Sequence, residues 1–222
     1  MQLTVCLILK KNKKYNKKII KFLKNFIYKL DVFYGEVGQK LPKKIKKKRY
    51  DFLISYLSPW IINHKILKRT KFYNINFHPG PPKYPGIGCF NFALLNNDNS
   101  YGVTMHLMNK SVDSGKIIKT QYFSIKNLNL IEIIDKSYDE MFKLFTKEIL
   151  KILKTKKINL SKEKWKRTAY TRKDLNKLLK LNLNMKPKEI TNRINALYYQ
   201  GYPNPYFTIN NKKFYVIPEK NS

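Results

Sequence analysis

An asparagine and a histidine two residues apart stand directly before an unusually stiff stretch of chain. The segment NINFHPGPPKYPGIG, residues 74–88, contains Asn76 and His78, and four prolines and three glycines follow them. Proline fixes φ and glycine permits tight bends, so we expect the loop to hold the histidine in a defined place. Imidazole moves protons near neutral pH, and an amide can donate to a developing oxyanion. The segment therefore predicts a site at which a carbonyl carbon is attacked.

A carboxylate is expected to join this pair from the turn SVDSGK, residues 111–116. Asp113 lies in that turn between two predicted strands, where it can face His78. It can raise the pKa of the imidazole and receive the proton of an attacking amine, directly or through water. Amide, imidazole and carboxylate together suit acyl transfer to an amine with no covalent enzyme intermediate. Ser111 and Ser114 flank Asp113, but no Ser–His–Asp elbow accompanies them, so a serine hydrolase fits poorly.

Each of these side chains also has an ordinary structural role. A lone histidine at a strand end is more often a structural hydrogen-bonding group, and an aspartate in a DSG turn is more often a turn former. The combination with the Pro/Gly loop favours the functional interpretation. His106, within GVTMHLM, is expected to be a packing residue or to support the site from behind, and His64 to lie on the surface.

Two other kinds of site fit the same region less well. A metal site built from His78, His106, Cys89 and Asp113 would follow no recognised ligand spacing, so no metal is expected. GIGCFN, residues 86–91, resembles a dinucleotide-binding loop only superficially. It lacks the third glycine and follows a loop rather than a strand.

The pattern of apolar residues predicts an α/β fold, a Rossmann-like and mainly parallel sheet flanked by helices. Strands are expected at 3–9, 31–37, 51–57, 72–77, 101–108 and 117–125. Helices are expected over 19–30, 89–97 and 130–153, with a further helix capped by Ser58 that has Pro59 at its first position. The lysine run at 41–50 is expected to be a loop or a short helix. Ligands of such sheets bind beyond the carboxyl ends of the strands, which is where strand 72–77 delivers Asn76 and His78.

The apolar pattern lapses near residues 154–166. We therefore expect residues 1–157 to form a catalytic core and residues 158–222 a small C-terminal cap. The cap should hold short helices near 172–181 and 187–197 and a β-hairpin that turns at Asn210 and Asn211, because asparagine tolerates positive φ. Its tyrosines are expected mostly to pack the cap on the core, with stacking on a nucleotide base as the alternative; they are Tyr198, Tyr199, Tyr202 and Tyr206.

The chain is strongly basic, with a formal net charge of +32 over 222 residues. Only five of its 46 basic residues are arginine, the residue that phosphate and guanine readers favour. Lysine, asparagine, isoleucine, tyrosine and phenylalanine all have A/T-rich codons, so a biased genome gives the same composition. The charge should still attract an anionic substrate. A basic nucleic-acid-binding protein without catalysis remains the alternative from another functional class.

Nothing in the sequence indicates a membrane segment or a secretory leader. No apolar run approaches the roughly 20 residues that a membrane helix needs. The start MQLTVCLILKKNKK has no basic leader and no small-residue cleavage site, so it is expected to be a buried strand. Cys6 and Cys89 lie far apart and suit a reducing compartment as small buried side chains. We expect a cytoplasmic protein with no membrane partner.

The two polar motifs together resemble the formyltransferase family that uses 10-formyltetrahydrofolate. Its Asn-x-His-Pro motif matches residues 76–79, and its Val-Asp-x-Gly motif matches residues 112–115. The resemblance runs from DFLISYLSPWII to GKII. It implies that Asn76, His78 and Asp113 are the catalytic residues and that 10-formyltetrahydrofolate is the formyl donor.

The resemblance also implies binding residues. Those for the folate are Leu57, Pro59, Trp60 and Ile61, with Val112 closing the other side of the pocket. Tyr84 and Gly86 match the family's loop after the histidine and are implied to contact the acceptor. The arginine of that loop is replaced here by Pro85, which removes the acceptor contacts that the arginine would make.

Family members formylate glycinamide ribonucleotide, methionyl-tRNA or sugar nucleotides. The tail ITNRINALYYQGYPNPYFTINNKKFYVI resembles the helix-plus-hairpin tail of sugar N-formyltransferases. A methionyl-tRNA enzyme is expected to carry a sizeable C-terminal β-barrel, for which the sequence after Lys154 is too short. The resemblance therefore implies an amino-sugar nucleotide acceptor, with tRNA or a purine precursor as alternatives. The aromatic tail is a candidate contact surface for a homodimer.

Overall fold

A six-stranded sheet forms the centre of the computed structural model, which describes residues 1–218. Its strands are β1 (Thr4–Lys10), β2 (Lys29–Gly35), β3 (Phe52–Tyr56), β4 (Tyr73–His78), β5 (Ser100–Leu107) and β6 (Ile117–Ser124), in the order β2-β1-β3-β4-β5-β6. The first four strands are parallel, and β5 and β6 are antiparallel to their neighbours. The predicted Rossmann-like, mainly parallel sheet is confirmed.

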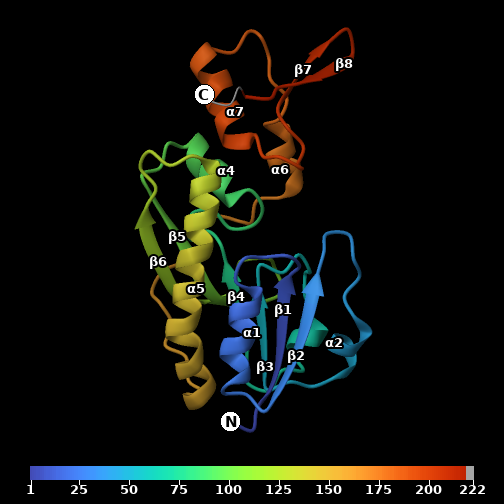
Figure 1. The fold of residues 1–222 in the computed structure, drawn as a ribbon, viewed down its shortest axis with the longest axis vertical. Coiled ribbons are helices and arrows are strands. Elements are labelled where there is room, and N and C mark those ends of the chain that lie inside the picture. Colours follow the sequence, from blue (N-terminus) through green and yellow to red (C-terminus); the bar gives the residue numbers. More distant parts are fainter. Residues whose placement is uncertain (219–222) are drawn as a thin grey trace.

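Helices cover both faces of this sheet (Figure 1). They are α1 (Asn16–Lys24), α2 (Lys43–Lys47), α3 (His64–Leu67), α4 (Cys89–Leu95) and α5 (Leu130–Thr155). Apolar residues of α1 and α5 pack with the sheet in one cluster, whereas α2 and α3 contribute Ile45, Ile66 and Leu67 to a second cluster. The 26-residue helix α5 begins with a complete capping box, in which Asn129 and Glu132 satisfy each other's backbone N–H groups.

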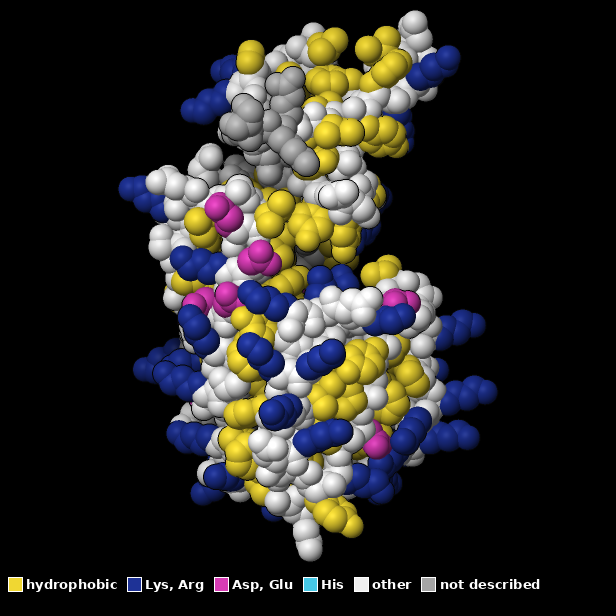
Figure 2. Space-filling view, in the orientation of Figure 1, with side chains coloured by type: hydrophobic (Ala, Val, Ile, Leu, Met, Phe, Trp, Pro, Cys, Tyr) yellow, Lys and Arg dark blue, Asp and Glu magenta, His cyan; other side chains and the backbone are white. Residues whose placement is uncertain are grey.

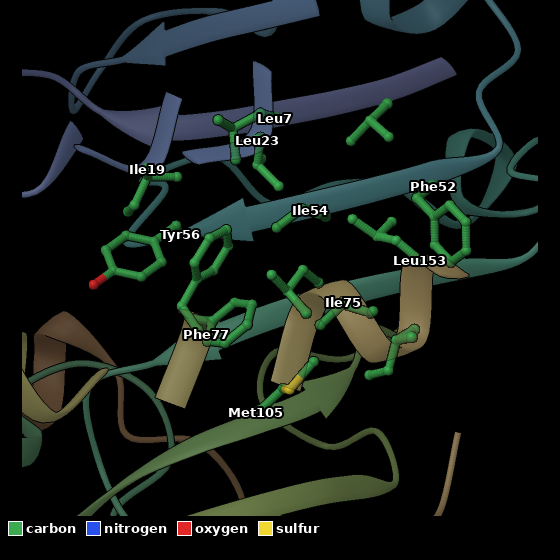
Figure 3. Packing of buried hydrophobic residues seen from close by; sticks show 14 of the residues in the cluster. Leu7, Ile19, Leu23, Phe52, Ile54, Tyr56, Ile75, Phe77, Met105 and Leu153 are labelled. Atoms are coloured by element: carbon green, nitrogen blue, oxygen red, sulfur yellow. The ribbon is translucent and has the colours of Figure 1, made fainter. Parts of the chain in front are cut away.

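The larger core cluster joins alternate side chains of the parallel strands to α1 and α5. Figure 3 shows Leu7, Ile54 and Ile75 from three neighbouring strands among these residues. These strand residues belong to one cluster because every second side chain of a strand points to the same face of the sheet. Cys6 and Ile8 belong to the cluster on the other face. Burial on both faces makes these strands read as continuous apolar runs.

Replacement of Phe145 by alanine is expected to lower the free energy of unfolding by about 3–5 kcal/mol. Its ring is fully buried, with its centroid 5.1 Å from that of Phe77 and 5.8 Å from that of Tyr56. Denaturant unfolding followed by circular dichroism measures the change. Lys147→Ala, at an exposed position of the same helix, should stay within about 0.5 kcal/mol of the wild type. Equal losses in the two variants would contradict the assigned core.

Two helix predictions need correction. No helix starts at Ser58, although the Ser58 hydroxyl accepts from the N–H of Trp60 as a helix cap does. The next helix, α3, starts six residues later and is capped by Asn63, whose side chain accepts from the Ile66 N–H. The helix expected over 19–30 ends at Lys24, since Leu30 already belongs to β2. The lysine run at 41–50 contains the short helix α2.

The C-terminal part contains α6 (Arg172–Lys177), α7 (Pro187–Leu197) and a hairpin of β7 (Tyr206–Ile209) and β8 (Lys212–Tyr215). The predicted hairpin is confirmed, and both turn residues, Asn210 and Asn211, have positive φ. Helix α6 ends four residues earlier than predicted. Residues 219–222 of the predicted cap lie outside the described residues.

The carboxyl ends of the parallel strands face the region where α4, α6 and α7 lie, in the upper part of Figure 1. Lysine and arginine side chains are spread over the face shown in Figure 2, and few acidic side chains interrupt them. Within residues 1–218, no helix is long and apolar enough to cross a bilayer. His64 is exposed, and Cys6 and Cys89 are buried, as predicted.

Candidate active site

Asn76, His78 and Asp113 lie together at the carboxyl end of β4. Asn76 and His78 are the fourth and last residues of the strand, and Asp113 comes from the turn between β5 and β6. His78 Nδ1 is 3.1 Å from Asp113 Oδ2, and Asn76 Nδ2 donates to Asp113 Oδ1 over 3.3 Å. The turn thus returns the carboxylate to the strand end that carries the amide and the imidazole.

His78 is held between two hydrogen-bond acceptors. Its Nδ1 faces the Asp113 carboxylate, and its Nε2 lies 2.9 Å from the carbonyl oxygen of Tyr84. Burial lowers the pKa of His78, although the Asp113 carboxylate and the Tyr84 carbonyl act in the opposite direction. The neutral imidazole has only one N–H for these two acceptors. A proton arriving on the ring would therefore find a partner already in place.

Asp113 remains ionised in spite of its burial. Burial by itself would raise the pKa of its carboxyl group, but His78, His106 and the N–H of Gly86 hold that pKa well below its ordinary value. The Gly86 N–H donates to Oδ2 over 2.8 Å. At neutral pH the site therefore contains a carboxylate beside a neutral imidazole, a combination suited to receiving a proton.

His106 belongs to the same polar group and contacts two of its members directly, whereas the sequence suggested only a packing or supporting role. Its Nε2 is 3.0 Å from Asn76 Nδ2 and 3.2 Å from Asp113 Oδ1. Its Nδ1 lies 2.8 Å from the carbonyl oxygen of Leu107, so both ring nitrogens of His106 face polar groups. The strand register explains this contact, because His106 is the residue of β5 that pairs with Asn76 of β4.

The hydrogen bonds of the Asn76 amide are directed into the group. Its Nδ2 lies 3.0 Å from His106 Nε2 and 3.3 Å from Asp113 Oδ1, and these two atoms are themselves 3.2 Å apart, so one N–H faces both of them and the other is left for a substrate oxygen. Asn76 alone of these polar residues keeps intermediate exposure, since His78, His106 and Asp113 are at most 9% exposed. Access from solvent is therefore on the Asn76 side.

Tyr84 and Gly86 lie where they position the polar group. The Tyr84 ring is buried and its hydroxyl donates to Asp98, so its contact with the site is made through its carbonyl group. Gly86 has φ +86° and donates its N–H to Asp113. The stiff loop thus supplies two backbone partners, one to the imidazole and one to the carboxylate. Sequence motifs do not encode such backbone contacts directly.

Gly86→Ala is expected to destabilise the protein more than Gly38→Ala does. Both glycines have φ near +87°, so both variants incur the left-handed strain of about 1–2 kcal/mol. A Cβ at Gly86 would lie 2.3 Å from the carbonyl oxygen of Tyr170, whereas nothing lies within 4 Å of a Cβ at Gly38. Denaturant unfolding of the two variants measures the difference. Equal losses would show that Tyr170 does not press on Gly86.

The residues implied to bind folate follow β3. Leu57 has φ +56°, and Pro59 and Trp60 pack against Gly35 so closely that a Cβ there would lie 3.0 Å from both. Trp60 Nε1 donates to the carbonyl oxygen of Gln39. Ile61 and Val112 are 74% and 42% exposed and are free to contact a ligand. Leu57, Pro59, Trp60 and Ile61 directly follow the carboxyl end of β3, and Val112 directly precedes Asp113.

Trp165 is a neighbour of the site that sequence analysis missed. Its ring centroid is 5.8 Å from that of His78 and 5.0 Å from that of His106, edge-on in both cases. The indole N–H donates to the carbonyl oxygen of Gly115, two residues after Asp113. Trp165 lies in the segment where the apolar periodicity lapses, so no pattern singled it out.

Comparison with known proteins relates residues 15–160 to one family. A family model described as "Formyl transferase" matches residues 15–160. A methionyl-tRNA formyltransferase of Wigglesworthia glossinidia brevipalpis is 27% identical over 173 residues, 78% of this chain and 54% of that protein. The chain spans about half the length of the methionyl-tRNA formyltransferases that it matches.

Two solved structures share the fold. A 4-N formyltransferase from Francisella tularensis superposes with a TM-score of 0.79 at 19% identity, over 100% of both chains. An N-formyltransferase from Helicobacter canadensis, in complex with folinic acid and dTDP-3-aminofucose, has a TM-score of 0.71 at 21% identity. That match covers 96% of this chain and 86% of the other.

Proposed function

We propose that this chain, which belongs to the formyl transferase family, transfers a formyl group from 10-formyltetrahydrofolate to the primary amine of an amino-sugar nucleotide. The observation that carries the proposal is the convergence of Asn76, His78 and Asp113 at one strand end, with 3.1 Å between imidazole and carboxylate. Their amide, imidazole and carboxylate groups match what the transfer of an acyl group between two amines requires.

The reaction needs one proton to be removed and one to be supplied. The acceptor amine attacks the formyl carbon, a C–N bond forms, and the formyl oxygen gains negative charge. Asn76, which keeps intermediate exposure, donates an amide N–H to this oxygen. Asp113 and His78 accept the proton of the amine between them, and the imidazolium is stabilised by the carboxylate and the Tyr84 carbonyl. The bond between the formyl carbon and folate N10 then breaks, and N10 takes up a proton.

The proposed folate site uses the segment after β3. Leu57 in its left-handed conformation presents backbone groups, with Pro59, Trp60 and exposed Ile61 as an apolar wall and Val112 on the other side. A flat, partly polar ring system suits such a site. In this arrangement the formyl group reaches the polar residues from the exposed Asn76 side.

The extent of the shared fold supports the sugar-nucleotide acceptor. The match with the Francisella 4-N formyltransferase runs over the complete length of both chains, including the C-terminal helices and hairpin. The Helicobacter enzyme was solved with an amino-sugar nucleotide and a folate in one complex. The positive charge of this chain suits a diphosphate, because a basic surface raises the local concentration of anionic substrates.

A panel of nucleotide-linked amino sugars tests this proposal. Each is incubated with the protein and 10-formyltetrahydrofolate, and the release of tetrahydrofolate is followed together with the mass of the sugar product. At least one amino sugar should be formylated, with tetrahydrofolate released in equal amount. Turnover of none of them, with folate bound, would contradict the proposed acceptor.

Methionyl-tRNA is the second candidate acceptor, because the sequence relatives are mostly methionyl-tRNA formyltransferases. The same assay with methionyl-tRNA decides between the two. Formylation of methionyl-tRNA without turnover of any nucleotide sugar would select this alternative. Steeply salt-dependent tRNA binding without turnover of either acceptor would instead indicate a nucleic-acid-binding protein.

A further inference from the structure

The segment between α5 and α6 is tied along the edge of the polar site. The Ser161 N–H donates to the carbonyl oxygen of Ile117, and the Lys166 N–H donates to that of Pro82. Tyr170 exchanges backbone hydrogen bonds with Pro85 and Ile87. Residues 161–170, hereafter the strap, are therefore anchored to the start of β6 and to the stiff loop that positions His78.

Trp165 is the side chain through which the strap reaches the polar site. It is partly buried, unlike the neighbouring Lys164, which is exposed. Its indole lies edge-on to both imidazoles, and its Nε1–H donates over 2.8 Å to the Gly115 carbonyl oxygen. One side chain thus contacts both histidines of the site and the turn that carries Asp113.

The site that Trp165 covers is buried. His78 is 4% exposed and Asp113 9%, although both lie at the end of a strand, where side chains usually meet solvent. The turn that carries Asp113 is packed tightly against β5, because a Cβ at Gly115 would lie 1.8 Å from the carbonyl oxygen of Leu107. A hydrogen bond to the Gly115 carbonyl therefore restrains the position of Asp113 as well.

We propose that Trp165 is a positioning residue that closes the site to water on the imidazole side and fixes the turn of Asp113. This inference rests on the proposed formyl transfer. Water can replace the acceptor amine at the formyl carbon. A C–O bond then forms, the bond to folate N10 breaks, and a proton moves from water to N10, which yields formate and tetrahydrofolate. Exclusion of water favours the amine over this side reaction.

Three variants test the inference in the full-length protein. Trp165→Ala removes the cover and the hydrogen bond, Trp165→Phe keeps an aromatic ring but loses the indole donor, and Lys164→Ala is the matched control in the strap. The ratio of formate to formylated acceptor should rise at least about tenfold in Trp165→Ala, and kcat for transfer should fall by about 10- to 100-fold. Trp165→Phe should keep a low formate ratio while kcat falls, and Lys164→Ala should match the wild type.

Titration of the histidines by NMR gives a readout that needs no turnover. The chain has three histidines, so the His78 signals can be assigned with a His78→Gln variant. The groups around His78 are Asp113, His106 and the Tyr84 carbonyl, and Cys89 is near but neutral, since burial raises the pKa of its thiol to about 12. All of them remain in Trp165→Ala. Because burial lowers the pKa of His78, uncovering it should move the titration upward, toward the ordinary value of 6.5.

The outcomes separate the two proposals. An unchanged His78 titration and an unchanged formate ratio in Trp165→Ala would overturn the role of Trp165, even with formyl transfer intact in the wild type. A shifted His78 titration in Trp165→Ala supports the covering role of Trp165 even when the protein formylates no acceptor. In that case only the proposed function is contradicted. If Trp165→Ala does not fold, Trp165→Phe decides the question. A loss of kcat in Trp165→Phe at unchanged folate affinity supports the proposed restraint on Asp113, and a wild-type kcat in that variant overturns the restraint.

Discussion

Asp113→Asn should lower kcat/KM for formyl transfer by about 10²- to 10⁴-fold, with little change in folate affinity. The substitution keeps size and shape, and an amide oxygen can still accept from the Gly86 N–H. It removes the negative charge beside His78, and with its oxygen facing Gly86 its amide nitrogen would take the place of Oδ1, beside His106 Nε2 and the Asn76 amide. The imidazole and carboxylate that together accept the proton of the attacking amine are then no longer both present. Initial rates of tetrahydrofolate release, with folate binding measured separately, give the two quantities.

Asp31→Asn is the matched control for this experiment. Asp31 is also a partly buried carboxylate, but it is paired with Lys48 and Tyr50 and has no contact with the residues of the site. Its removal should affect stability and leave kcat within about twofold of the wild type. Comparable losses of kcat in both variants would indicate a general effect of charge rather than a role of Asp113. Polyanion binding should be the same in Asp113→Asn and in the wild type.

His78→Gln is expected to reduce kcat/KM by about 10²- to 10³-fold and to change its dependence on pH. In the wild type, burial lowers the pKa of His78, so the imidazole is neutral at pH 7 and takes up a proton only below its ordinary value of 6.5. A protonated His78 cannot accept the proton of the amine. Activity should therefore fall on the acid side, below pH 6.5, and the variant should lack this fall. Rates measured from about pH 5 to 8 test the point.

The exposed His64 provides the control for His78. His64→Gln should retain both the rate and the acid limb of the wild type. An acid limb that persists in His78→Gln would assign the titration to another group, and His106 would be the first to examine.

The sequence predicted the sheet well because its strands are buried on both faces. Continuous apolar runs such as LTVCLIL became β1, and the spacing of Asn76 and His78 placed both at the end of β4. A turn between neighbouring strands was enough to bring Asp113 within 3.1 Å of His78. These features depend on local pattern and on the rule that ligands of open sheets bind beyond the carboxyl strand ends.

Other features depend on contacts that local pattern does not contain. The cap signal of Ser58 and Pro59 did not produce a helix: Leu57 has a left-handed conformation, and the chain forms no regular structure from Ser58 to Asn63. The roles of the Tyr84 carbonyl and the Gly86 N–H come from the backbone of a loop whose shape is fixed by packing against Tyr170. Trp165 reaches the site from a segment without any periodicity, 52 residues after Asp113.

The most direct test of the site is the transfer of an isotopically labelled formyl group from folate to the acceptor by His78→Gln, Asp113→Asn and the protein that carries both substitutions. Because the two side chains share one proton in the proposed mechanism, their losses should not add. We expect the double variant to transfer label about as slowly as the slower single variant. Losses that multiply, or single variants that transfer label at the wild-type rate, would contradict a joint action of His78 and Asp113 on the reacting formyl group.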